Sequence, residues 1–373
     1  MPFSNKFMHE IAGEVLCKMN QTNAAVCPFS LMLGLTVVSM ASTKQTQTHD
    51  QMCKLLGMNP ENEEIFVEDC NKTKKEIIEY EGDVKINMAS SIWCDGSVKN
   101  EFKDWCSEKM DVQVRALVEG KFMNAWVAEH TKDRIKQIVT GDPTGPLVIL
   151  QAFDFDGKWT FPFNPAKTYT APFHFDCKKP PMTCQMMQMT QRLQHRTISD
   201  VEILRLPYGD DSNFVAHVLM PPMGYEKDEF DNIKKATDLV FDPKAWNLAM
   251  DSLVYEKFKL RMPKFKIECN ESLNTPLYML GMENAFGRDE NMPSFERLTD
   301  TNNVYVKSVK QAIKLEVNEV GTKMVSSDAV ELSFRGRDPY DTIEVNRRFL
   351  FVVSHLPTGA IMLASIVYTP EYK

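Results

Sequence analysis

Residues 147–159 read Leu-Val-Ile-Leu-Gln-Ala-Phe-Asp-Phe-Asp-Gly-Lys-Trp. The apolar run from Leu147 to Phe155 lacks helical spacing, and Gly157 follows it. A short apolar run that ends at a turn residue is typical of a strand buried in a sheet. We therefore predict a central strand here.

The strand-like runs are concentrated after this stretch, whereas helical spacing dominates the part before it. Further strands are predicted at 84–94, 201–207, 214–220, 253–267, 304–318, 349–354 and 360–368. Helices are predicted around Phe7–Leu16, at Leu31–Met40, where nearly every residue is apolar, and at Phe122–Val139, whose pattern is amphipathic. Helices that come early and strands that come late indicate an α+β fold with large antiparallel or mixed sheets.

The composition is that of an ordinary globular protein. Apolar residues make up 43% of the 373 residues and charged residues 25%, with a net charge of −8. This acidic balance argues against nucleic acid and anionic membranes as partners, and no apolar run approaches the ~20 residues that span a bilayer. We expect a monomer.

The cysteines and the first twenty residues indicate the cellular compartment of the protein. Nine cysteines, an odd number, show neither a Cys-x-x-Cys pair nor a zinc-ligand spacing. Met1–Asn20 has the pattern of an amphipathic helix rather than a secretion signal. We expect reduced thiols, and a protein that is cytoplasmic or secreted without a signal peptide.

A search for catalytic residues finds none. The chain has no Gly-x-Ser-x-Gly elbow, no His-Glu-x-x-His and no phosphate-binding Gly-x-x-x-x-Gly-Lys. Its seven histidines are dispersed, and His217 in an apolar strand is interpreted as structural. We predict that the protein is not an enzyme and uses no metal or cofactor.

One segment, about 319–346, breaks the sequence of strands. A structureless segment of about thirty residues is uncommon inside a domain and is usually functional. Its first half alternates as a strand does, and Gly336 and Pro339 interrupt its second half. We interpret it as a loop that is able to become a strand.

Separated motifs resemble the serpin family in order and spacing. They cover essentially the whole chain: Asn23–Ser30, with Cys27 where serine is usual; Asn124–Ile135; Leu150–Trp159, with Phe163 and Thr168–Phe173; Met186-Met187; Leu206–Gly209; Pro263–Phe265; Glu319–Thr322; Phe349–Phe351; and Pro357–Gly359. The resemblance implies a single domain, 1–373, with three sheets, about eight or nine helices and an exposed reactive-centre loop. It also implies a suicide substrate, whose loop is cleaved by a serine protease and then inserts into the central sheet.

The resemblance also implies which residue enters the specificity pocket of the protease and is cleaved, here called the bait. In the family the scissile residue lies fourteen positions after the hinge glycine, which from Gly321 gives Arg335, followed by Gly336. An arginine suits a specificity pocket with a carboxylate at its base, so a trypsin-like protease is the expected target. Phe334 and Arg337 are the alternative bait residues.

The hinge residues implied by the resemblance are not all of the inhibitory type. The hinge comprises Glu319, Gly321, Thr322, Lys323, Met324, Val325, Ser326, Ser327 and Asp328. Lys323, Met324 and Val325 depart from the small or acidic residues usual in inhibitors, and Asp328 is expected to turn inward. Since an unpaired buried carboxylate costs several kcal/mol, Asp328 is expected to slow insertion.

Two further groups match family positions that control opening of the sheet. Lys264 and Glu319 are expected to form an ion pair, with Trp159 beside it. Ser30, Gln151 and Gln311 correspond to a hydrogen-bonded cluster in which Asn and His are here both Gln. Two amides supply each other's donor and acceptor, and the loss of His removes a titratable group, so we expect opening at this point to be insensitive to pH between about 5 and 8.

Two alternatives remain. The first is a non-inhibitory serpin with a binding or storage role, favoured by Lys323, Met324 and Asp328. The second is a cross-class inhibitor that traps cysteine proteases.

Overall fold

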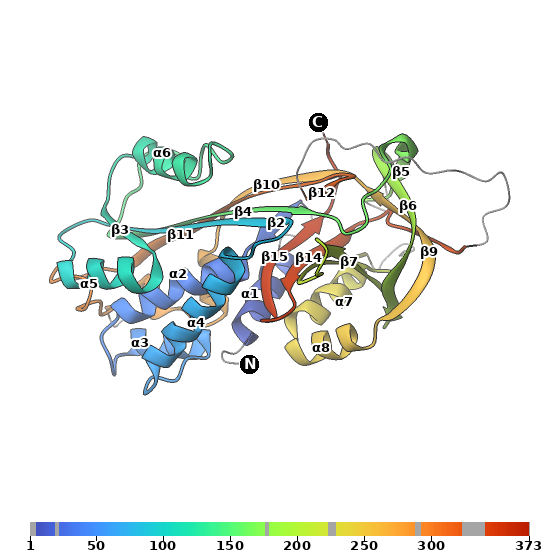
Figure 1. Cartoon of the computed structure of the whole chain (residues 1–373). Helices are drawn as coiled ribbons and strands as arrows, with labels where there is room; N and C mark the ends of the chain where they lie inside the picture. The colour runs from blue at the N-terminus through green and yellow to red at the C-terminus, as the bar shows by residue number, and fades with distance from the viewer. Residues whose placement is uncertain are drawn as a thin grey trace.

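The computed structural model describes residues 5–18, 22–175, 179–222, 229–287, 292–322 and 340–372. Two sheets and nine α-helices are formed within these ranges (Figure 1). The helices are α1 Lys6–Lys18, α2 Pro28–Ala41, α3 Gln47–Leu56, α4 Glu63–Ile78, α5 Asn100–Trp105, α6 Gly120–His130, α7 Glu229–Phe241, α8 Pro243–Asp251 and α9 Asn274–Met279. None of the helices described is both long and apolar enough to cross a bilayer.

The central sheet has six strands in the order β10-β11-β12-β4-β2-β3. They are β2 Val84–Cys94, β3 Gln113–Ala116, β4 Leu147–Lys158, β10 Phe265–Ser272, β11 Val306–Val317 and β12 Gly321–Thr322. The predicted strand at 147–155 is confirmed as β4, which lies in the middle of this sheet. Its first nine residues are all buried. Helix α6 packs on part of the outer face of the sheet (Figure 1), and α2 and the second sheet pack on the inner face.

The second sheet has nine strands. They are β1 Ala24–Val26, β5 Tyr169–Phe173, β6 Met182–Ile198, β7 Val201–Tyr208, β8 Phe214–Met220, β9 Val254–Pro263, β13 Thr342–Glu344, β14 Phe349–His355 and β15 Ala360–Val367. The long strand β6 pairs with β5 and β9 through its first part and with β7 through its last part. It therefore joins the second and third sheets of the expected three into one hydrogen-bonded array.

The helix α2 lies beneath the central sheet and is buried along its whole length. Pro28 is the first residue of α2, where the amide hydrogen that proline lacks would have no partner within the helix. Apolar residues lie on every face of α2, as is typical of a buried helix. Gly34 faces Gln151 of β4, and a Cβ at this position would lie 2.3 Å from the amide nitrogen of Gln151. One apolar cluster runs through both sheets and the helices between them.

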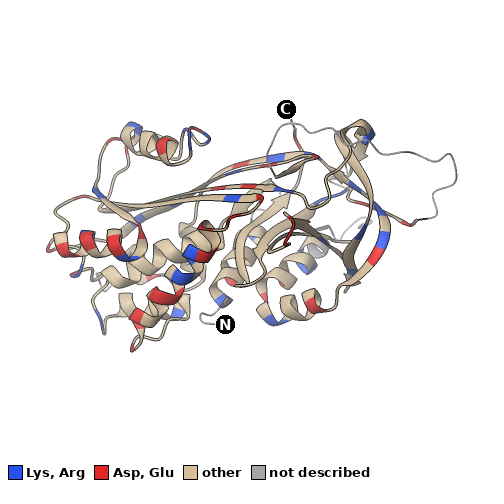
Figure 2. Cartoon of the chain, in the orientation of Figure 1, with Lys and Arg blue, Asp and Glu red and all other residues tan. Residues whose placement is uncertain are grey.

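Of the Lys, Arg, Asp and Glu side chains that the structure describes, all but Glu63, Asp154 and Glu319 are at least partly exposed. Helix α4 and strand β9 each carry residues of both signs (Figure 2). The eight cysteines in the described ranges are free thiols.

Two sequence predictions were wrong in detail. The helix expected at Phe122–Val139 ends at His130, because Lys132 and Asp133 adopt left-handed backbone conformations with φ of 52° and 60°. The strand expected at 253–267 is two strands in different sheets, β9 and β10, separated at Lys264. In both cases the hydrophobic pattern continues across the break, since the residues beyond it pack against the same core.

Candidate functional site

The candidate site begins where Gly321 and Thr322 enter the central sheet as the short strand β12. Thr322 pairs with Gly157 of β4 on one side and with Val317 of β11 on the other. A Cβ on Gly321 would lie 2.1 Å from the carbonyl oxygen of Gly157. Only glycine allows so close an approach of two backbones, which is the physical reason for a hinge glycine at this position.

Beyond β12 the gap between the two neighbouring strands is closed. Residues 306–314 of β11 pair directly with residues 147–154 of β4, in parallel, with Gln311 opposite Gln151. Gly321 and Thr322 thus separate β4 from β11 at one end of the sheet, and the two strands pair directly with each other along the rest.

Thr322 is held by aromatic residues beneath the sheet. Its side chain is fully buried, and its hydroxyl lies 2.5 Å from the Tyr208 hydroxyl. The Tyr208 ring stacks on Trp159 with a centroid distance of 4.4 Å, and the Trp159 indole donates to the carbonyl of Asn318. The Trp159 amide also donates to the carbonyl of Val320 at 2.9 Å, so Trp159 binds the residues on both sides of Glu319 in the chain, which agrees with its expected place beside the ion pair of Glu319.

The expected pair of Glu319 and Lys264 lies at the same end of the sheet, with 3.0 Å between Nζ and Oε2. The hydroxyl of Thr168 donates to the other carboxylate oxygen at 2.7 Å. Burial alone would raise the pKa of Glu319, but the hydrogen bonds from Thr168 and from its own backbone, together with Lys264, hold the pKa below its ordinary value. Lys264 also lies over the ring of Tyr372, at 4.4 Å.

The two amides meet farther along the closed part of the sheet. Gln311 Nε2 donates to Gln151 Oε1 at 3.2 Å and to the carbonyl of Cys27 at 3.1 Å, and Gln311 Oε1 accepts from the Cys27 amide at 2.6 Å. Gln151 Nε2 donates to the carbonyl of Ser30 at 2.6 Å. The predicted amide-to-amide bond is therefore present, but Ser30 takes part through its backbone and not through its hydroxyl.

The helix α6 covers the outer face of this closed region (Figure 1). Trp126 and Val127 of α6 pack with Leu150 and Ala152 of β4 and with Ala312 of β11. Any strand that enters between β4 and β11 must therefore disturb the contacts of α6.

The remaining candidate residues lie outside the described ranges. These are Lys323, Met324, Val325, Ser326, Ser327 and Asp328 of the hinge, the bond Arg335-Gly336, and the alternative baits Phe334 and Arg337.

Three contacts of the site were not predicted. Thr168 and Tyr208 lie within motifs that support the resemblance, but neither was assigned a role. Tyr372 carries no sequence signal, and its place over Lys264 follows from the path of the last residues along β10, where Glu371 accepts from the Lys266 amide.

Comparison with known proteins gives one family. The model of the family described as "Serpin (serine protease inhibitor)" matches residues 3–370. Plasminogen activator inhibitor 1 of Neovison vison is 32% identical over 66% of this chain and 61% of its own length, and serine protease inhibitor 2 of Anopheles gambiae is 23% identical over 95% and 89%. Human thyroxine-binding globulin, solved with thyroxine, has the same fold, with a TM-score of 0.84 at 18% identity over 98% of this chain and 99% of that one.

Proposed function

The chain belongs to the serpin family, and from this we propose that it is a suicide inhibitor of a trypsin-like serine protease, with Arg335-Gly336 as the scissile bond. The observation that carries the proposal is the position of Gly321 and Thr322. They already stand as the first residues of a strand between β4 and β11. The two strands on either side are those that an inserting loop has to separate.

The chemistry of the proposed trap starts as ordinary proteolysis. The serine hydroxyl of the protease attacks the carbonyl carbon of Arg335, an ester forms, and Gly336 leaves with the proton as a free amine. Insertion of the segment before Arg335 then carries the esterified protease along the sheet before water hydrolyses the ester.

The register of β12 specifies where the inserting residues would go. Pairs of β12 with β4 join Gly321 to Lys158 and Thr322 to Gly157, so continuation pairs residues 323–332 with residues 156–147. Leu332 would then face Leu147, the first residue of β4, and Arg335 would lie past the end of the strand. The segment from Gly321 to Leu332 is therefore long enough to pair with the whole of β4.

The same register gives Asp328 two partners. Continuation of β12 along β4 places Asp328 opposite Gln151, and continuation along β11 places it opposite Gln311. The two predictions agree, because Gln151 and Gln311 already face each other in the closed sheet. Side chains of directly opposed residues lie on the same face, so we propose that Asp328 replaces the amide-to-amide bond with hydrogen bonds to both amides.

These partners reduce the cost that Asp328 imposes. A new central strand adds about twenty ladder hydrogen bonds, or on the order of 10–30 kcal/mol before chain entropy. An unpaired buried carboxylate costs several kcal/mol, and a hydrogen bond to a charged group recovers about 1.5–3 kcal/mol. We propose that insertion proceeds, and that the separation of Gln151 from Gln311 contributes to its barrier.

To test the proposal, the protein is mixed with trypsin and the products are separated on a denaturing gel. A band near the summed mass that is lost in Arg335→Ala supports the proposal. Arg337→Ala and Phe334→Ala are the matched controls, and they should keep the band. Complete cleavage without the band would remove the inhibitory assignment.

The non-inhibitory alternative is favoured by Lys323 and Met324 in the hinge. It predicts cleavage of the loop without a gain of heat stability, whereas an inserting loop raises the melting temperature of the cleaved chain. A stable complex with a papain-like enzyme, and none with trypsin, would identify the cysteine-protease alternative.

A further inference from the structure

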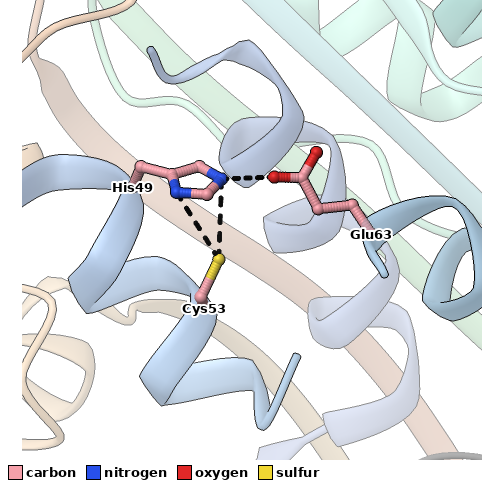
Figure 3. A group of neighbouring side chains, drawn as sticks. All are labelled: His49, Cys53 and Glu63. Atoms are coloured by element: carbon pink, nitrogen blue, oxygen red, sulfur yellow. Dashed lines mark hydrogen bonds and ion pairs between the residues drawn. The ribbon is translucent and has the colours of Figure 1, made fainter. Parts of the chain in front are cut away.

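Far from the hinge, three side chains of metal-ligand type converge between α3 and α4. The imidazole of His49 lies between the thiol of Cys53 and the carboxylate of Glu63 (Figure 3). One ligand atom from each residue lies within 4.8 Å of the others, and each residue is 2–3% exposed. No metal is predicted from the sequence, which has neither a Cys-x-x-Cys pair nor a common zinc-ligand spacing.

The backbone holds these residues in place. His49 and Cys53 are four residues apart and share one face of α3. Thr46 caps the start of this helix, and Gly57, in the left-handed conformation, ends it. Glu63 is the first residue of α4, so a cation at this point would join the two helices.

Rotation of the side chains would bring the three donors around a tetrahedral ion. The Cys53 sulfur lies 3.6 Å from His49 Nε2 and 3.8 Å from Nδ1, so it does not lie along the lone pair of Nε2. Rotation of the thiol or of the imidazole has to bring the sulfur to the lone-pair side, where Zn–S and Zn–N bonds of ordinary length place S and N roughly 3.5 Å apart. Nε2 and Glu63 Oε1 are 2.6 Å apart as a hydrogen bond. Loss of the shared proton and a shift of less than about 1 Å would bring them to ligand spacing.

The surroundings are those of a second ligand shell. Lys44 and Arg297 lie 3.0 and 3.7 Å from Glu63 Oε2, so they occupy that oxygen and leave Oε1 facing the imidazole. Asp50 Oδ1 is 3.9 Å from His49 Nδ1, on the side where a metal-bound histidine commonly has a carboxylate.

The chemistry of the donors selects the ion. One sulfur, one imidazole nitrogen and one carboxylate oxygen suit Zn²⁺ and exclude Mg²⁺ and Ca²⁺, which take oxygen ligands. A thiolate and a carboxylate together balance the charge of a divalent cation. Burial raises the pKa of Cys53 to about 11, so the ion has to displace the thiol proton on binding.

From this geometry we propose that His49, Cys53 and Glu63 form a zinc site that joins α3 to the start of α4. The site is independent of the reactive loop, so its failure or success says nothing about protease inhibition. Binding should stabilise the native chain, since an ion that binds only the folded state shifts unfolding by mass action.

The first experiment titrates the metal-free chain with Co²⁺ and follows absorption. Expected are a single site, visible bands of a tetrahedral ion, a thiolate charge-transfer band in the near ultraviolet, and displacement of all of these by Zn²⁺ but not by Mg²⁺. Cys53→Ala should abolish the charge-transfer band, and His49→Gln and Glu63→Gln should each weaken binding at least tenfold. Cys106→Ala is the matched control, because Cys106 is equally buried and should leave the spectrum unchanged.

The second experiment needs no variant. X-ray absorption of the Zn²⁺-bound native chain should show one sulfur at about 2.3 Å together with nitrogen or oxygen neighbours near 2.0–2.1 Å. A shell without sulfur, no binding at 100 µM Co²⁺ or Zn²⁺, or a charge-transfer band that persists in Cys53→Ala would each overturn the proposal and leave a hydrogen-bonded cluster.

Discussion

Arg134, in the segment after α6, forms an ion pair with Asp154 of β4, and Asp154 lies opposite Lys314 of β11. The side chains of Arg134 and Asp154 are 12% and 4% exposed. The amide of Asn87 also donates to Asp154, at 3.2 Å. The segment that follows α6 is therefore fastened to one of the two strands that the proposed insertion separates.

Removal of the arginine should destabilise the native state. Arg134→Met leaves the Asp154 carboxylate buried without its cation, and breaking one side of a buried pair typically costs about 3–5 kcal/mol. We expect a loss of about 3 kcal/mol in the free energy of unfolding, measured by denaturant titration. The double variant Arg134→Met with Asp154→Asn should recover part of it. Lys136→Met, at an exposed position of the same segment, is the control, and an equal loss there would refute the role of the ion pair.

Gly321→Ala should expel β12 from the sheet. The added Cβ meets the Gly157 carbonyl oxygen at 2.1 Å and the Lys158 Cα at 2.8 Å, and both are backbone atoms of β4 that cannot rotate away. Exchange of the Thr322 amide should then become much faster in hydrogen-exchange measurements. Thr322→Val keeps the shape but loses the hydroxyl contact with Tyr208, so it should cost about 1 kcal/mol and leave β12 in place. Unchanged protection in Gly321→Ala would contradict the close approach.

Glu319 should make the stability depend on pH in the acid range. Its folded-state pKa lies below the ordinary value of 4.5. The stabilisation is therefore present above about pH 4.5 and is lost as the pH falls through the folded pKa. Glu319→Gln should lower the free energy of unfolding by about 2 kcal/mol at pH 7. The difference in the free energy of unfolding between Glu319→Gln and the native chain should shrink toward pH 3. A constant difference between pH 7 and pH 3 would show that Glu319 does not cause the pH dependence.

His355 should give a second pH effect at higher pH. Burial lowers its pKa from 6.5 to about 4, so the unfolded chain takes up the proton first and stability falls as the pH drops from 6.5 toward 4. Since one pKa unit corresponds to about 1.4 kcal/mol, the loss reaches at most about 3 kcal/mol. His355→Gln should remove this part of the pH profile. His174→Gln, at an exposed position, should leave it intact, and a profile that is the same in both variants would exclude His355 as its source.

The parts of the fold that were predicted are those with a strong local pattern. Strands β2, β4, β8 and β14 and the buried helix α2 have unbroken apolar runs, and their predicted bounds agree with the structure to within three residues. Strand β6 was missed, because its alternating Met, Gln and Thr residues have low contrast between the two faces. The end of α6 was misplaced because left-handed backbone conformations at Lys132 and Asp133 stop the helix. The boundary between β9 and β10 was missed because the apolar pattern continues across Lys264.

The candidate site divides in the same way. Contacts such as Gln151 with Gln311 were predicted because the resemblance aligns both positions. Tyr372 on Lys264, Arg134 with Asp154, and the convergence of His49 with Glu63 depend on how distant segments pack, and no local pattern records them. The loop itself was predicted from its length and its break in periodicity alone.

The amide pair leads to the last prediction. Gln311 is 2% exposed and satisfies Cys27 and Gln151 at once, so Gln311→Leu should cost about 2–3 kcal/mol through the unpaired Cys27 amide and Gln151 oxygen. Neither Gln nor Leu at position 311 titrates, and His355 and every other titratable group are present in both chains. The difference in the free energy of unfolding between the native chain and this variant should therefore stay constant between pH 5 and 8. Gln311→His places a titratable ring in the same buried position. Since burial disfavours the charged imidazole, its stability relative to Gln311→Leu should fall as the pH drops below about 6.5. A difference between the native chain and Gln311→Leu that itself varied over this range would show that opening of the sheet here is coupled to a proton.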